Sequence, residues 1–106
     1  MSEPYVAEPA AETIASLQGP TVVEFGTNWC GFCQAAQPLI EAAFAHQRSI
    51  KHIKVEDGKG RPLGRQYRVK LWPTLIFLRD GEEVTRVVRP RSSAEVVDAL
   101  NAIAKA

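Results

Sequence analysis

Cys30 and Cys33 are the only cysteines of this chain, and they lie where a strand pattern changes into a helix pattern. The preceding segment, 21–26, is short, apolar and rich in β-branched residues, as buried strands are. The following segment, 33–47, is rich in alanine with helical spacing, and Pro38 inside it predicts a kink. Cys30 is therefore expected at a helix N-terminus, where unpaired N–H groups and the helix dipole favour a thiolate. Because the thiolate is the attacking species in disulfide chemistry, the pair predicts a thiol–disulfide site.

The remaining pattern predicts an α/β fold in which helices cover both faces of a central mixed sheet. The expected elements are a short helix over 9–17, a strand over 50–55, a helical turn over 63–67, strands over 74–78 and 83–88, and a final helix over 94–104. Asp80-Gly81 is a hairpin turn signal between the last two strands. Ser92, with Glu95 three residues later, predicts a capping box before the final helix.

Length and composition indicate one domain over residues 1–106 that can bury a core without covalent staples. Hydrophobic residues make up 45% and charged residues 24%, as in ordinary soluble domains. The formal net charge of +1 gives no bias toward nucleic acid or membranes. Prolines at 4 and 9 leave residues 1–8 as at most a weak edge strand or a flexible segment.

No long apolar run and no secretory pattern are present, so we expect a cytoplasmic protein that acts as a monomer. In a reducing compartment a Cys pair is more often catalytic or metal-binding than structural. Two thiolates supply half of a tetrahedral zinc site, and His46 and His52 are not at ligand spacing from them. We therefore expect no metal, and we interpret both histidines as surface or packing residues.

Over nearly its whole length the sequence resembles the thioredoxin family. The resemblance rests on Val23-Glu24-Phe25, Trp29-Cys30-Gly31-Phe32-Cys33, Pro38, Lys54, the segment 67–74 with Pro73 at the position of the family's cis-proline, and Asp80-Gly81. A lone Cys-X-X-Cys is a weak signal, but together with these other residues it is specific. The resemblance implies a thioredoxin fold and a protein-disulfide reductase that needs no cofactor beyond the redox-active Cys30–Cys33 disulfide.

The resemblance also implies roles for individual residues. Cys30, expected to be exposed, would attack a substrate disulfide, and the buried Cys33 would resolve the mixed disulfide. A buried thiol has a raised pKa and needs a base, which would be Glu24 with Lys54 as its partner. A plain buried ion pair is the alternative for these two residues. Protein disulfides would be the substrates, and an upstream reductase would be the electron donor.

Substrate contacts are expected around the cysteines and the proline loop. The candidate residues are Trp29, Gly31, Phe32, Trp72, Pro73, Thr74 and Arg89. In the family, the backbone of the residue before the cis-proline pairs with the substrate as a short strand, which here would be Trp72. Trp29 could equally be a packing residue, and Pro73 an ordinary trans turn proline.

Several positions depart from the usual thioredoxin pattern. Phe32 replaces a proline and restores an N–H that could point at the Cys30 sulfur. This predicts that the Cys30–Cys33 couple is less reducing than that of thioredoxin, whose potential is about −270 mV. Glu24 replaces an aspartate, as in the catalytic domains of protein disulfide isomerases. Gly26 stands where tryptophan is common. Leu71, Trp72 and Arg89 enlarge the rim and predict a narrower set of substrates, unless these changes are neutral.

Two further function classes remain open from the sequence. One is an isomerase or oxidant with a less reducing couple. The other is a binding module that uses the rim and the basic stretch 59–91 to hold one partner. Metal bridging between two chains is a remote third class.

Overall fold

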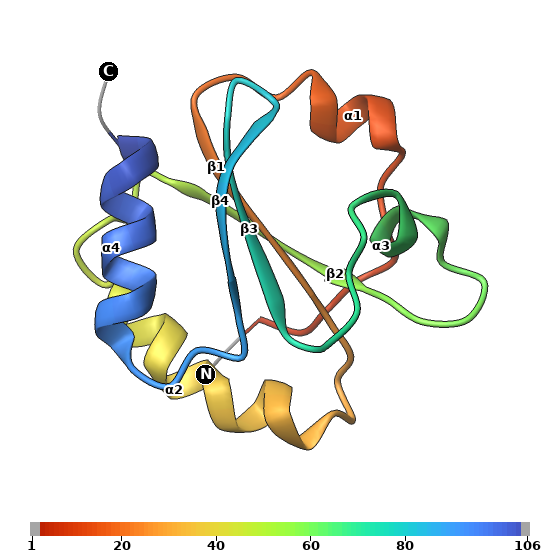
Figure 1. Ribbon diagram of the computed structural model, residues 1–106, viewed down its shortest axis with the longest axis horizontal. Coiled ribbons are helices and arrows are strands. Elements are labelled where there is room, and N and C mark those ends of the chain that lie inside the picture. The colour runs from red at the N-terminus through yellow and green to blue at the C-terminus, as the bar shows by residue number, and fades with distance from the viewer. Residues whose placement is uncertain (1–2, 105–106) are drawn as a thin grey trace.

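A mixed sheet of four strands forms the centre of the structure, a computed structural model that describes residues 3–104 (Figure 1). The elements in chain order are α1 (Ala11–Ala15), β1 (Pro20–Gly26), α2 (Gly31–Phe44), β2 (Lys51–Glu56), α3 (Pro62–Gln66), β3 (Thr74–Arg79), β4 (Glu82–Val88) and α4 (Ser93–Ala104). The strand order is β2-β1-β3-β4, with β1 and β2 parallel and the other pairs antiparallel. The predicted mixed sheet and the hairpin between its last two strands are confirmed.

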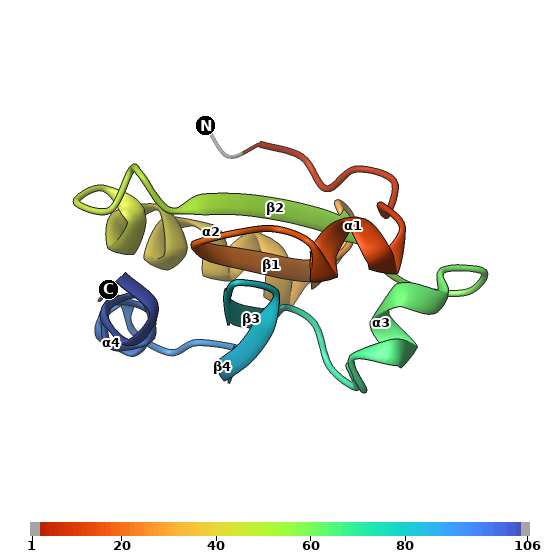
Figure 2. The same cartoon turned by 90° about the horizontal axis from the view of Figure 1, so that it is seen from above.

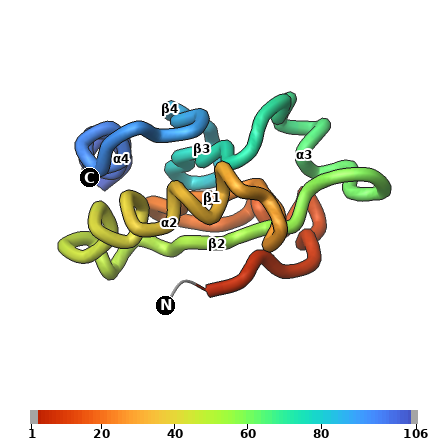
Figure 3. The backbone as a smooth tube through the Cα atoms, turned by 90° about the horizontal axis from the view of Figure 1, so that it is seen from below, coloured from red at the N-terminus to blue at the C-terminus, as the bar shows by residue number. Residues whose placement is uncertain are grey.

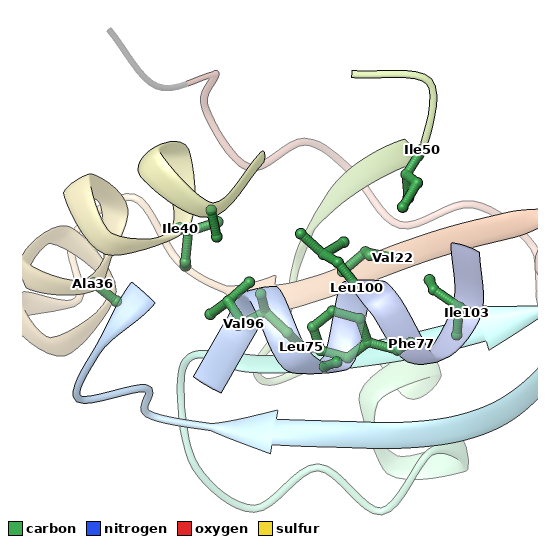
Figure 4. Packing of buried hydrophobic residues seen from close by; sticks show 11 residues of the cluster. Val22, Ala36, Ile40, Ile50, Leu75, Phe77, Val96, Leu100 and Ile103 are labelled. Atoms are coloured by element: carbon green, nitrogen blue, oxygen red, sulfur yellow. The ribbon is translucent and has the colours of Figure 1, made fainter. Parts of the chain in front are cut away.

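Side chains of the central strand β1 alternate between two apolar layers, because successive strand residues point to opposite faces. Val22 packs under α2 and α4, whereas Val23 and Phe25 pack under α1 and α3. Figure 4 shows the first layer, where Leu100 and Ile103 of α4 meet Val22 and strand β3. Helices therefore cover both faces of the sheet, which Figure 2 shows edge-on. Glu24 shares the α2 face with Val22, and this places a carboxylate beneath that helix.

The observed helices begin at other residues than predicted, because the N-cap residue sets where each helix starts. Helix α2 spans Gly31–Phe44 rather than 33–47, because Cys30 is its N-cap. Pro38 lies inside α2. Helix α1 is shorter than the predicted 9–17, and it begins after Ala10, whose side chain cannot cap it. The helical turn near residue 63 is α3, with Pro62 at its start, where the missing N–H costs nothing.

The capping box before α4 is confirmed. The Glu95 carboxylate accepts hydrogen bonds from the N–H groups of Ser92 (3.1 Å) and Arg91 (2.7 Å). In return, the Glu95 N–H donates to the Ser92 hydroxyl at 3.4 Å. The apolar face predicted for this helix is also present, with Leu100 and Ile103 fully buried.

The N-terminal segment forms a single bridge rather than an edge strand. Val6 donates its N–H to the Lys54 carbonyl (3.1 Å) and accepts from the Glu56 N–H (2.7 Å). Figure 3 shows this segment running beside β2. Residues 1–2 of the predicted weak strand lie outside the described residues. The segment is nevertheless tied down by Tyr5, which is 7% exposed.

The β3–β4 hairpin turns through Asp80 and Gly81, whose φ angles are 52° and 85°. Both residues have the positive φ that a type I′ hairpin requires. A Cβ on Gly81 would lie 2.1 Å from the carbonyl oxygen of Ala15, at the end of α1. The turn thus needs glycine for its backbone and also for its close approach to the helix.

We expect Gly81→Ala to lower the free energy of unfolding by at least about 1 kcal/mol more than Gly60→Ala does, since overpacking adds to the backbone strain. Gly60 is the matched control, because its φ is 80° and nothing lies within 4 Å of the position that a Cβ would take there. Urea unfolding of the two variants measures the difference. Equal losses in the two variants would contradict the role assigned to the Ala15 contact.

Candidate functional site

The two cysteines lie at the start of α2, directly after the carboxyl end of β1. The Cys30 sulfur caps the helix and accepts a hydrogen bond from the Cys33 N–H at 3.2 Å. Cys30 is 8% exposed and Cys33 is 1% exposed, so Cys30 is the more accessible of the two. The expectation that Cys30 is exposed is wrong, because Tyr5 and Trp72 pack against the pair. A substrate sulfur therefore has a narrow approach to Cys30 and none to Cys33.

The Cys33 thiol is held in its protonated form. Burial, followed by its hydrogen bond with Cys30, raises the pKa of Cys33 to about 12. At neutral pH this thiol is a poor nucleophile unless a nearby group takes its proton. The sequence predicted both this direction and its cause.

Glu24 is fully buried on β1 and accepts three hydrogen bonds. The Tyr5 hydroxyl and the Gln37 amide (2.9 Å) donate to Oε2, and His52 Nε2 lies 2.8 Å from Oε1. Burial alone would raise the pKa of Glu24, but the hydrogen bond and charge of His52 lower it, and the net shift is downward. The carboxylate is therefore ionised and able to receive a proton.

Lys54 is not the direct partner of Glu24, contrary to the prediction. It stands opposite Glu24 in the β1–β2 register, but its ammonium donates to the Gln37 side-chain oxygen (2.7 Å) and to the Glu3 carbonyl. His52, interpreted from the sequence as a surface or packing residue, takes the predicted place. Its position two residues before Lys54 on the same strand puts both side chains on one face of β2, and this is the signal that could have identified it.

Tyr5 and Gln37 were not found by sequence reasoning. Tyr5 enters from the N-terminal segment and fills the space beside Gly26, where a Cβ would lie 2.8 Å from the tyrosine hydroxyl and 2.7 Å from the Cys33 sulfur. Gly26 at a position where tryptophan is common was a sign of this space, but it could not indicate which residue fills it. Gln37 sits one turn after Cys33 on α2 and donates to the Cys33 carbonyl at 2.9 Å.

The proline loop lies against the cysteines, and its Trp72–Pro73 peptide bond is cis, as the resemblance implied. The Trp72 ring meets Trp29 edge-on with centroids 5.7 Å apart, and its N–H donates to Asp57 at 2.8 Å. Thr74 is buried, and its hydroxyl donates to the Leu71 carbonyl at 2.6 Å. The loop is thus held by its own side chains, while Trp29 is 73% exposed beside it.

Apolar side chains and two arginines, Arg89 and Arg91, border a groove at the rim of the site. Phe32 and Leu71 are exposed and border a groove of about 560 Å³ together with Arg89. The Arg89 guanidinium lies 3.8 Å from the centre of the Phe32 ring, and its Nε donates to the Trp72 carbonyl at 2.8 Å. Gly31, the first residue of α2, is exposed and has open space around its Cα.

The extra N–H supplied by Phe32 does not serve the Cys30 sulfur. In the described hydrogen bonds, the donor to that sulfur is the N–H of Cys33. The hydrogen bond on which the prediction of a less reducing couple depended is therefore not made in this structure, because the Cys30 sulfur accepts the N–H of the third helical residue, Cys33, rather than that of the second, Phe32.

Within residues 3–104, no group of three or more His, Cys, Asp or Glu side chains is placed to hold a metal ion. In the same part of the chain, no helix has the length and apolar character needed to cross a membrane.

Comparison with known proteins places these features in one family. The thioredoxin family model matches residues 5–102. A thioredoxin of Chlamydia trachomatis is 40% identical over 79 residues, covering 74% of each chain, and a thioredoxin-like protein of Synechocystis is 31% identical over 91 residues, covering 85% of this chain and 87% of the relative. Among solved structures, reduced thioredoxin 2 from Pseudomonas aeruginosa PAO1 superposes with a TM-score of 0.88 at 52% identity, covering 98% of this chain and 97% of that chain.

We expect His52→Leu to raise the pKa of Glu24, because the burial that His52 offsets then dominates. With its lowered folded pKa, Glu24 contributes stability above its unfolded pKa of about 4.3, and this contribution is lost as the pH falls through the folded value. In His52→Leu the folded pKa of Glu24 lies above its unfolded value, so Glu24 destabilises the fold as the pH rises from the unfolded towards the folded pKa. The free energy of unfolding at neutral pH therefore falls by about 3 kcal/mol, and this difference from the wild type shrinks as the pH is lowered.

Urea unfolding between about pH 3 and pH 7 tests this expectation. His46→Leu is the control, because His46 is exposed and should leave the pH profile unchanged. Identical profiles for His52→Leu and the wild type would show that His52 does not hold Glu24 ionised.

Proposed function

Since the chain belongs to the thioredoxin family and is a thiol–disulfide oxidoreductase with a Cys-X-X-Cys pair, we propose that it reduces disulfides in other proteins, with Cys30 as the nucleophile and Cys33 as the resolving thiol. The observation that carries this assignment is the asymmetry of the pair. Cys30 is the more accessible sulfur and receives the N–H of Cys33, whereas Cys33 is buried with a pKa raised to about 12.

In the first step, the Cys30 thiolate attacks one sulfur of the substrate disulfide. A mixed disulfide forms, and the other substrate sulfur leaves as a thiolate. The substrate chain pairs as a short strand with the backbone of Trp72, which lies in contact with the cysteine pair. Trp29, Gly31, Phe32, Pro73 and Thr74 form or support this docking edge.

In the second step, Cys33 loses its proton and attacks Cys30, which releases the second substrate thiolate. Glu24 is the general base for this step, because it is the ionised carboxylate beneath the pair. Gln37 links Glu24 to Lys54 by accepting from Lys54 and donating to Glu24, so Lys54 acts on the base through an intermediate. The site needs no cofactor beyond the Cys30–Cys33 disulfide.

The partners of this reaction are protein disulfides and an upstream reductase that restores the dithiol. A monomer in the cytoplasm suits this role, since both cysteines, the base and the docking loop come from one chain and a reductant needs a reducing compartment. The isomerase alternative relied on the Phe32 donor and on Glu24, and the described hydrogen bonds do not contain the Phe32 donor. The family assignment together with an intact pair does not favour a passive binding module.

Insulin reduction tests the assignment. The wild type is expected to turn over with an upstream reductase, Cys30→Ser to be inactive, and Cys33→Ser to accumulate a mixed disulfide through Cys30. In single-turnover measurements with Glu24→Gln, resolution of the mixed disulfide is expected to slow about 100-fold, the scale of general base catalysis. A mixed disulfide formed by Cys30→Ser would reverse the roles of the cysteines, and an unchanged rate in Glu24→Gln would remove the base.

Arg89 limits access to the docking edge, because its Nε occupies the Trp72 carbonyl that a substrate strand would use. We expect Arg89→Gly to raise kcat/KM for insulin about two- to tenfold, the worth of one hydrogen bond. Arg91→Gly is the matched control, since Arg91 borders the same groove. Its substitution removes the same charge but leaves the Trp72 carbonyl bound to Arg89. Equal effects of the two variants would attribute the change to charge alone.

A further inference from the structure

Tyr5 stands between the resolving thiol and the carboxylate that is assigned as its base. The ring packs against both cysteines, and its face lies 4.6 Å from the Lys54 ammonium. The hydroxyl donates a hydrogen bond to Glu24 Oε2. It also lies near the Cys33 thiol, because a Cβ on Gly26 would be 2.8 Å from the hydroxyl and 2.7 Å from the Cys33 sulfur. The Tyr5 hydroxyl therefore lies beside both the group that loses a proton in the second step, Cys33, and the group that receives it, Glu24.

Gly26 provides the room for this contact. A Cβ at that position would lie 2.7 Å from the Cys33 sulfur and 2.8 Å from the Tyr5 hydroxyl, too close to both groups. Any side chain at 26 would thus force the thiol or the tyrosine to move. The glycine at 26 thus leaves the space in which the Tyr5 hydroxyl can lie near the Cys33 thiol.

We propose that the Tyr5 hydroxyl is the proton carrier of the resolving step, passing the proton of Cys33 to Glu24. This proposal deepens the proposed function and depends on Glu24 being the base. Tyr5 touches the reacting sulfur, so it is a catalytic residue in this step.

The step balances as a concerted transfer. The Cys33 S–H gives its proton to the Tyr5 oxygen, while the Tyr5 O–H gives its own proton to Glu24 Oε2. The sulfur electron pair of Cys33 forms the bond to Cys30, and the bond between Cys30 and the substrate sulfur breaks with its electron pair on the substrate thiolate. Tyr5 ends neutral, as it began, and Glu24 ends protonated.

The surroundings of Tyr5 suit a carrier that is never left charged. Burial first, and then the charge of Glu24, raise the pKa of Tyr5, so the hydroxyl keeps a proton at neutral pH. Gln37 donates to the Tyr5 oxygen (3.3 Å) and to Glu24 Oε2 (2.9 Å), which fixes the two groups relative to each other. Lys54 faces the ring rather than the hydroxyl.

Glu24 can return its proton on the side away from the cysteines. Its second oxygen, Oε1, is hydrogen-bonded to His52, whose side chain is 23% exposed. His52 and Gln37 line a cavity of about 740 Å³ beside β2 and α2. Solvent in this cavity takes up the proton after the substrate has left, and His52 acts there as a positioning residue for the carboxylate.

The test measures the single-turnover rate at which the mixed disulfide between Cys30 and a thionitrobenzoate leaving group is resolved. Tyr5→Phe keeps the ring but removes the hydroxyl, and we expect it to slow resolution about 10- to 100-fold while the first step keeps its rate. Tyr67→Phe is the matched control: Tyr67 packs on Phe25 under the other face of the sheet and should leave the rate unchanged.

Glu24→Gln and the double variant separate this proposal from the proposed function. Slowing in both single variants, with no further slowing in the double variant, supports a shared path. A normal rate in Tyr5→Phe with a slow Glu24→Gln overturns the carrier and leaves the base in place. Normal rates in both overturn both assignments, and a slow Tyr5→Phe with a normal Glu24→Gln overturns the transfer from Tyr5 to Glu24.

A proton inventory in mixtures of H₂O and D₂O gives a readout that a merely structural role would not change. Two protons move together in the wild type, so the plot of rate against deuterium fraction is expected to curve, and in Tyr5→Phe it is expected to be linear. Gly26→Ala provides a second variant, because it retains Tyr5 and pushes its hydroxyl away from the thiol; it too is expected to give slow resolution. A wild-type plot that is linear, or a normal rate in Gly26→Ala, overturns the proposal.

Discussion

The burial of one ionised carboxylate, Glu24, organises this end of the molecule. An unpaired carboxylate inside a protein costs several kcal/mol in lost hydration, so it must be supplied with hydrogen-bond donors. The donors come from three separate parts of the chain: Tyr5 from the N-terminal segment, Gln37 from α2 and His52 from β2. Meeting this need draws the N-terminal segment onto the edge of the sheet. His52 and Lys54 stand on one face of β2, and that face carries the groups that surround the buried carboxylate.

Elements specified by local pattern were predictable, and contacts specified across the chain were not. The strand before Cys30 and the capping box of α4 follow from residues a few positions apart, and each was predicted within a few residues of its observed bounds. Tyr5 escaped prediction because its segment has no periodicity and its partners lie far along the chain. The family resemblance put the partner of Glu24 on the correct strand, but the choice between His52 and Lys54 depends on side-chain reach, which spacing alone does not give.

Within residues 3–104, the cation of Arg89 at the rim has no carboxylate within ion-pair distance and is held by other contacts. The Arg89 guanidinium rests on an aromatic face and donates to a main-chain oxygen, so its charge stays uncompensated beside an apolar groove. Arg89 itself has a φ of 49°, in the region that glycine adopts most readily. Arg89 thus places a side chain at a backbone conformation that favours glycine. Its contacts with the Phe32 ring and the Trp72 carbonyl offset the backbone strain. The groove consequently combines apolar area with a positive edge.

The single bridge formed by Val6 has a consequence for the dynamics of the site. An element joined to a sheet by one bridge opens at a lower free energy than the strands behind it, and amide exchange would report this opening well before global unfolding. Each such opening withdraws Tyr5 and admits water to Glu24. The dielectric around the carboxylate on β1, and with it the readiness of Cys33 on α2 to react, therefore depends on how firmly the N-terminal segment stays seated against β2.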